Sequence, residues 1–140
     1  MKKIFLILVI ASFIATASCG GKSTEEQAPA DSIAASIIGK SIQIEGLLIA
    51  QNDFPNQMNW LDAQKACASL GPGWRLPTKD ELNILYQSKD KIGGFFDHDF
   101  YWSSTEDGTG VTWCQQFSSG EQISLGTRPN DYHVRAVKSF

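Results

Sequence analysis

The sequence is poor in basic residues, cysteine and histidine. Its 140 residues include 12 lysines and arginines against 15 aspartates and glutamates, with three cysteines and two histidines. An acidic chain has no general basic surface, so we expect no nucleic-acid partner. His98 and His133 do not stand at metal-ligand spacing, and two distant cysteines do not complete a site. We therefore expect no metal and no cofactor.

The sequence also lacks an apolar run long enough to cross a membrane, which takes about 20 residues. Its longest run, Ile4 to Ala17, has fourteen residues and follows two lysines. A basic start, a short apolar stretch and small residues before a cleavage point are typical of a secretory signal. Because the small residues lead to Cys19, the segment resembles a bacterial lipoprotein signal. We predict a signal peptide over residues 1–18 and lipid on Cys19; an ordinary signal ending in a chance cysteine is the alternative.

One domain is expected after this signal. About 120 residues remain, and losing the two lysines leaves a net charge of 10 − 15 = −5. Residues 19–37 are small and polar without apolar periodicity, so we predict a flexible tether there and a folded domain over residues 38–140. Gly20 is not the aspartate that retains enteric lipoproteins in the inner membrane. A lipid anchor in the outer membrane of the cell envelope, on its periplasmic or surface side, is the expected location.

Two helices are predicted near the middle of the chain. Asn59 can cap the first, whose apolar residues fall on one face and which ends at Gly71. The second begins at Thr78, where Thr78 and Glu81 have the spacing of a capping box. The alternation in residues 42–50 predicts one bent strand or two short ones, and later strands are predicted at 100–103, 111–117, 122–125 and 133–137. This order indicates an α+β fold with an antiparallel sheet.

Several segments, taken in order, resemble the bacterial domain family named after the C-terminal domain of the Legionella collagen-like adhesin. The resemblance covers residues 46–138. It is carried by Trp60-Leu61-Asp62-Ala63 with Cys67, Gly73-Trp74-Arg75-Leu76-Pro77-Thr78-Lys79-Asp80-Glu81-Leu82, Ile92-Gly93-Gly94-Phe95, Tyr101-Trp102-Ser103-Ser104-Thr105, Trp113 and Val134-Arg135-Ala136-Val137. It implies a C-type lectin-like fold, with two helices, a mainly antiparallel sheet, chain ends close together and a long loop region. For the named adhesin it implies trimeric binding of sulfated polysaccharide.

Cys67 and Cys114 remain once Cys19 is assigned to lipid. In an oxidising compartment two such cysteines usually form a disulfide, and lectin-like domains commonly tie their first helix to the sheet. We predict this disulfide, with two separate buried thiols as the alternative.

The remaining motif residues are interpreted as structural. Tryptophans in strands are usually buried, and an internal hydrogen bond or ion pair suits Arg75 better than a ligand contact. This structural set comprises Trp60, Trp74, Arg75, Pro77, Thr78, Glu81, Trp102 and Trp113.

The sequence assigns no catalytic, metal-binding or ligand-binding residue. Acidic residues at 97–99 and 106–107 could suit calcium, but the carbohydrate-binding signatures of C-type lectins are missing, and solvated loops are the better interpretation. A non-catalytic module that binds glycan or protein is the leading hypothesis, although the acidic charge disfavours sulfated polysaccharide. The alternative is a structural envelope or fimbria-associated assembly component, and oligomers are compatible with either function.

Overall fold

The computed structural model describes residues 28–108, 110–126 and 130–140. The predicted signal peptide, Cys19 and the predicted tether up to residue 27 lie outside the described residues. Within the described part, no helix is both long and apolar enough to span a membrane.

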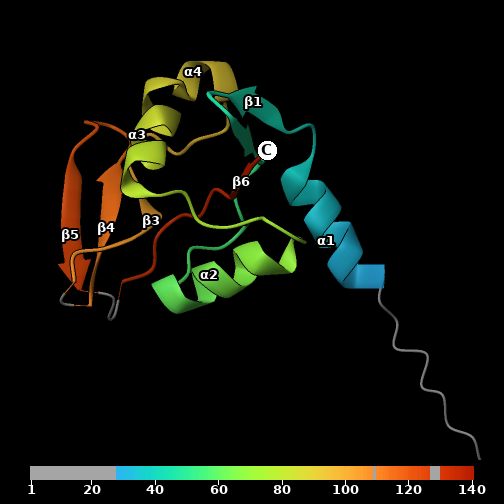
Figure 1. Cartoon of the computed structure of the whole chain (residues 1–140), viewed down its shortest axis with the longest axis horizontal. Coiled ribbons are helices and arrows are strands. Elements are labelled where there is room, and N and C mark those ends of the chain that lie inside the picture. The colour runs from blue at the N-terminus through green and yellow to red at the C-terminus, as the bar shows by residue number, and fades with distance from the viewer. Residues whose placement is uncertain (1–27, 109, 127–129) are drawn as a thin grey trace, which may run out of the picture.

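The described chain forms helices packed against two antiparallel sheets of three strands (Figure 1). One sheet has the order β1-β2-β6 and the other β3-β4-β5. The elements are α1 (Ala28–Ile38), β1 (Ile42–Ile44), β2 (Leu47–Ile49), α2 (Trp60–Ser69), α3 (Lys79–Gln87), α4 (Lys89–Ile92), β3 (Phe100–Glu106), β4 (Val111–Gln116), β5 (Gln122–Gly126) and β6 (Val137–Ser139). The predicted α+β class with antiparallel sheets is confirmed.

The first helix corrects the predicted tether. Residues 28–38 form α1, whose Ile37 is buried in the main core, and Ala34 and Ile38 pack against that core. The side-chain amide of Asn52 also donates to the Ser36 carbonyl oxygen at 2.8 Å. Apolar residues at helical spacing therefore extend the folded part of the chain at least to Ala28, because their burial offsets the cost of ordering the segment.

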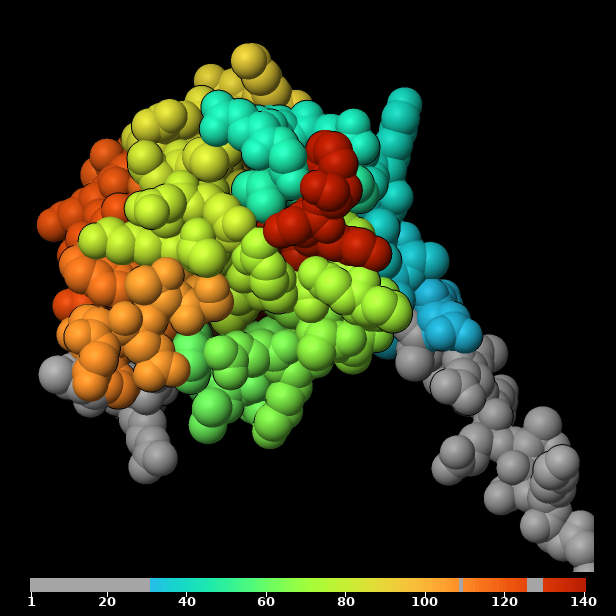
Figure 2. All heavy atoms as spheres, viewed as in Figure 1, coloured from blue at the N-terminus to red at the C-terminus, as the bar shows by residue number. Residues whose placement is uncertain are grey.

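The first sheet brings the beginning and the end of the folded part together. A turn at Glu45 and Gly46, both with positive φ, joins β1 to β2 as a tight hairpin. β2 then pairs with β6, with Ile49 opposite Val137. Figure 2 shows the C-terminal residues in red against this hairpin on one face of the molecule. The predicted strand over 133–137 is wrong in its position: β6 begins at Val137, and the preceding residues make only isolated bridges.

Both helix starts follow from their caps. The Asn59 side chain accepts a hydrogen bond from the Asp62 backbone N–H at the start of α2. At the start of α3 the Thr78 hydroxyl accepts from the Glu81 N–H at 3.2 Å, and the Glu81 carboxylate accepts from the Thr78 N–H at 2.8 Å. The predicted capping box is therefore present.

The second sheet separates two hydrophobic clusters. Successive side chains of a strand point to opposite faces, so Trp102 joins the cluster that includes α2 and Tyr101 joins the one that includes α3. Trp102 and Tyr101 are both fully buried. The strand pair β3–β4 carries an irregularity between Trp102 and Glu106, where the register shifts.

Candidate functional site

Three connections between the helices and strands meet on one side of the domain. We call the surface formed by residues 51–58, 93–99 and 130–133 the loop face. Met58 and Tyr132 exchange two backbone hydrogen bonds of 3.1 and 3.2 Å, and the Phe54 N–H donates to the Val134 carbonyl oxygen at 3.2 Å. These bonds join the first and third connections, although about 75 residues separate them in the sequence.

Arg135 is the buried centre of the loop face. Its side chain is fully buried, and its Nη1 donates to the Gln51 carbonyl oxygen at 2.8 Å and the Ala50 carbonyl oxygen at 3.2 Å. Its Nη2 donates to the Gly94 carbonyl oxygen at 2.8 Å, and Nη1 lies 3.4 Å from that of Gly93. Both glycines have positive φ, a conformation that side chains disfavour. The planar guanidinium therefore fixes two connections at once.

Asp53 balances the charge of Arg135. Its Oδ1 accepts from Arg135 Nε, and its Oδ2 accepts from the Tyr101 hydroxyl at 2.5 Å. Burial raises the pKa of Asp53 above its usual value, while the Arg135 charge and these hydrogen bonds act in the opposite direction. Burial and the nearby Asp53 charge raise the pKa of Tyr101, which keeps the phenol protonated as a donor. The hydrogen bonds from Arg135 and Tyr101 thus satisfy the buried Asp53 carboxylate, which is not presented as a reactive group.

Phe95 and Phe96 point to opposite environments. Phe95 packs edge-on against Tyr101, with ring centroids 5.4 Å apart, and lies 4.1 Å from the guanidinium carbon of Arg135. Phe96 is 54 % exposed, and its backbone N–H donates to the Tyr101 hydroxyl oxygen at 2.9 Å. One phenylalanine thus anchors the connection, and the other presents an aromatic ring to solvent.

His133 lies directly against the exposed Phe96 ring. The two rings stack with centroids 4.3 Å apart and an interplanar angle of 16°. His133 Nε2 is 3.0 Å from Asp99 Oδ2, and its Nδ1 is buried without a hydrogen-bond partner. Asp99 thereby holds the imidazole that supports Phe96.

The loop face presents an exposed aromatic ring beside polar side chains. Among the residues that the structure describes, no three or more histidine, cysteine, aspartate or glutamate side chains are grouped so as to hold a metal ion. The acidic stretches at 97–99 and 106–107 therefore do not assemble such a group. The chemistry available here is stacking on Phe96 and hydrogen bonding to the surrounding carboxylates and amides.

The residues of the predicted structural set lie away from the loop face or beneath it. Arg75 donates to both Glu81 carboxylate oxygens, at 2.6 and 2.8 Å, in a pair next to the capping box. Trp74 and Pro77 are buried, and the Pro77 carbonyl oxygen accepts from the Ser104 N–H at 2.7 Å. This motif positions the start of α3.

The three other tryptophans have different surroundings. The indole N–H of Trp60 donates to the Ser103 carbonyl oxygen, and that of Trp102 donates to the Met58 carbonyl oxygen, both at 2.8 Å. Trp113 was expected to be mostly buried, but it is only partly so. Lys79 Nζ lies 3.2 Å from the centre of the Trp113 ring, so a cation–π contact covers one face of this partly exposed indole.

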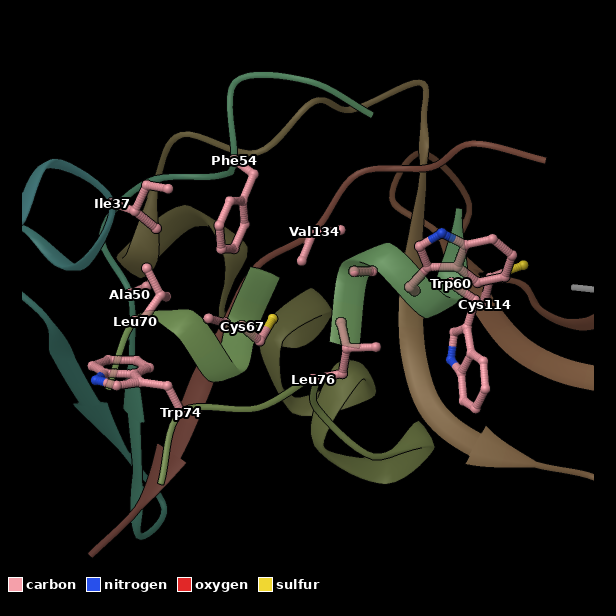
Figure 3. Packing of buried hydrophobic residues seen from close by; sticks show 13 residues of the cluster. Ile37, Ala50, Phe54, Trp60, Cys67, Leu70, Trp74, Leu76, Cys114 and Val134 are labelled. Carbon is pink, nitrogen blue, oxygen red and sulfur yellow. The ribbon is translucent and has the colours of Figure 1, made fainter. Parts of the chain in front are cut away.

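The predicted disulfide is not present in the structure, where Cys67 and Cys114 are free and buried. Figure 3 shows their sulfur atoms in different parts of the same cluster. Cys114 Sγ instead donates to the Ile123 carbonyl oxygen in β5 at 3.6 Å, whereas Cys67 lies in the second half of α2. Burial raises the pKa of each thiol to about 12, so both behave as small apolar core residues.

Sequence reasoning assigned no role in a site to Asp53, Phe96 or Arg135. Two signals for them were present in the chain. An arginine within the apolar run Val134–Val137 requires a buried carboxylate partner, and the Phe95-Phe96 pair follows two glycines in a connection. Neither signal identifies the partner, because the hydrogen bonds of Arg135 span 41 to 85 residues.

The comparisons with known proteins agree with this architecture. The sequence model of a family described as the Lcl C-terminal domain matches residues 39–138. No curated protein shows significant sequence similarity to the chain. Among solved structures, the chain is similar to the Yersinia pseudotuberculosis adhesin InvE, with a TM-score of 0.56 and 14 % identity over 71 % of this chain and 34 % of that one. The chain thus spans about a third of the length of that adhesin.

Two further structures match over nearly their whole length. Botrocetin has a TM-score of 0.55 and 14 % identity over 72 % of this chain and 96 % of its own. EMS16, described as an antagonist of the collagen receptor integrin α2β1, has a TM-score of 0.52 and 10 % identity over 71 % of this chain and 97 % of its own. At these identities the likeness establishes the fold, which is C-type lectin-like as the sequence resemblance implied.

Proposed function

This chain belongs to the Lcl C-terminal domain family, and we propose that it is a lipid-anchored envelope protein whose lectin-like domain binds glycan or protein ligands at its loop face. The exposed Phe96 ring, fixed on His133 and bordered by Asp97 and Asp99, is the observation that carries this proposal. Fixed aromatic rings next to polar groups are typical of recognition sites.

The structural relatives support a binding role without catalysis. One is an adhesin, and another structure contains botrocetin in complex with the von Willebrand factor A1 domain, with a TM-score of 0.50 and 13 % identity over 73 % of this chain. In the loop face the Arg135 network fixes the backbone while Phe96 remains accessible, and a site held rigidly in this way suits recognition.

The anchor is a separate part of the proposal. Cys19 precedes the start of α1 at Ala28 by nine residues, which span at most about 32 Å when fully extended. This distance keeps the domain close to the membrane that holds the lipid. Growth of the native host with an alkynyl fatty acid should label the wild-type chain, whereas Cys19→Ala should abolish labelling and release the chain from the membrane fraction. A labelled Cys19→Ala variant would contradict the anchor.

The binding function is tested with the full-length chain in mild detergent. We expect saturable binding to at least one member of two panels, one of immobilised oligosaccharides and one of immobilised cell-surface proteins. A chain that is folded by circular dichroism and binds no member of either panel would contradict the proposal. Recovery of that inactive chain in a detergent-resistant envelope complex would favour the assembly role instead.

A further inference from the structure

Phe96 differs from the other exposed apolar residues in how firmly it is held. Its ring stacks on His133, its backbone N–H is bonded to Tyr101, and Asp99 holds the histidine from the other side. Leu61 is equally exposed, at 54 %, but lies on the solvent side of α2, where single apolar residues are ordinary. The Phe96 ring is therefore ordered before any ligand arrives, which reduces the entropy lost on binding.

The surroundings of Phe96 select against anions. The three segments of the loop face, residues 51–58, 93–99 and 130–133, contain no lysine or arginine, and three of their four aspartates lie outside the buried pair with Arg135. Lys89, a neighbouring cation, is paired with Asp97 at 2.9 Å. Carboxylates repel sulfate and carboxylate groups but accept hydrogen bonds from hydroxyl groups.

The accessible carboxylates lie next to the ring in the sequence. The side chain of Asp97 is 64 % exposed and that of Asp99 is 44 % exposed, and Asp99 lies 3.0 Å from the histidine on which Phe96 stacks. Exposed amide side chains at Asn56 and Gln57 belong to the same loop face and can both donate and accept. An aromatic surface with acceptors beside it matches a pyranose ring, which has an apolar C–H face and hydroxyl groups at its edge.

We infer that the loop face binds an uncharged glycan, with one pyranose ring stacked on Phe96 and its hydroxyl groups donating to Asp97 and Asp99. This inference rests on the proposed binding function and names the class of ligand for it. It assigns Phe96 as the contact that supplies most of the affinity, with His133 as its support. It also predicts that sulfated polysaccharide is a poor ligand for this chain.

The test compares Phe96→Ala with Leu61→Ala, two substitutions of apolar side chains with the same exposed fraction. The full-length chain in mild detergent is applied to neutral tetrasaccharides of glucose, galactose, mannose and N-acetylglucosamine, to heparin and to oligolysine. We expect at least one neutral tetrasaccharide to bind, Phe96→Ala to weaken that binding at least tenfold, and Leu61→Ala to change it less than twofold. Phe96→Trp should restore it, because the indole also provides a ring.

Three results would overturn the inference. One is neutral-glycan binding that Phe96→Ala leaves unchanged, and another is heparin binding that exceeds binding of every neutral tetrasaccharide. The third is binding of oligolysine alone, which would assign the acidic face to a basic protein segment. If the chain binds a protein at the loop face and no neutral tetrasaccharide, the inference fails while the proposed binding function stands. Thermal unfolding of both alanine variants checks that each remains folded.

Discussion

In the part of the chain that the structure describes, two arginine–carboxylate pairs differ in both sequence separation and burial. Arg75 and Glu81 are six residues apart, and their side chains are 38 % and 18 % exposed. Arg135 and Asp53 are 82 residues apart, and their side chains are 0 % and 6 % exposed. The first pair lies at the start of one helix, whereas the second lies beneath two connections of the loop face.

The comparison shows that similar ion pairs serve different purposes. A half-exposed pair stays partly hydrated, so it contributes little stability and is easily replaced. A buried pair has lost its water and depends on every remaining partner. Arg135 therefore fixes the shape of the loop face, while Arg75 donates to the Ser139 hydroxyl in β6 at 2.9 Å and supports a helix start that Thr78 already caps.

Arg135→Met should have the largest effect on stability. The substitution leaves Asp53 buried without its cation and removes the donors to the carbonyl oxygens of Gln51 and Gly94. Breaking a buried pair in this way costs about 3–5 kcal/mol. Urea unfolding followed by tryptophan fluorescence measures the loss. The double variant Asp53→Asn with Arg135→Met should recover part of it, and a single variant within 1 kcal/mol of the wild type would contradict the central role of Arg135.

The same contrast explains what could be predicted from the sequence. The capping box, α2 and the strands of the second sheet follow from local spacing, and the sequence predicted them. The Arg135 network depends on partners that only the completed fold brings together, so spacing could not reveal it. The short helix α1 was missed for another reason: its apolar residues Ile37 and Ile38 lie at its end, where the polar segment was taken to stop.

Thr78→Ala should have a smaller effect, because it removes one half of the capping box. The Glu81 N–H loses its acceptor, while the Glu81 carboxylate still accepts from the backbone at position 78. Loss of such a cap costs about 1 kcal/mol. Urea unfolding should show this decrease, and Thr78→Ser, which keeps the hydroxyl, should stay close to the wild type. A Thr78→Ser variant as unstable as Thr78→Ala would show that the methyl group, not the cap, is responsible.

Arg75→Met should have a still smaller effect. Its pair with Glu81 is bidentate but half-exposed, and exposed pairs are worth about 0–1 kcal/mol. Lys65→Met is the matched control, since Lys65 Nζ lies 3.6 Å from Asp62 Oδ1 and both side chains are mostly exposed. This substitution should produce no measurable change in stability. If Arg75→Met destabilised the domain as much as Arg135→Met, the distinction between the two pairs would fail.

The smallest expected effect is on how stability varies with pH, where the Glu81 and Asp53 carboxylates should act in opposite directions. Hydrogen bonds from Arg75 lower the pKa of Glu81, so its contribution is complete above the unfolded value of 4.5 and is lost as the pH falls through the folded value. Burial raises the pKa of Asp53, so its ionisation disfavours folding as the pH rises from 3.8. The stability gap between the wild type and Glu81→Gln should therefore narrow from pH 7 to pH 3, by less than about 1 kcal/mol. A gap that widened on acidification would mean that Glu81 is held protonated, and the half-exposed pair would then resemble the buried one.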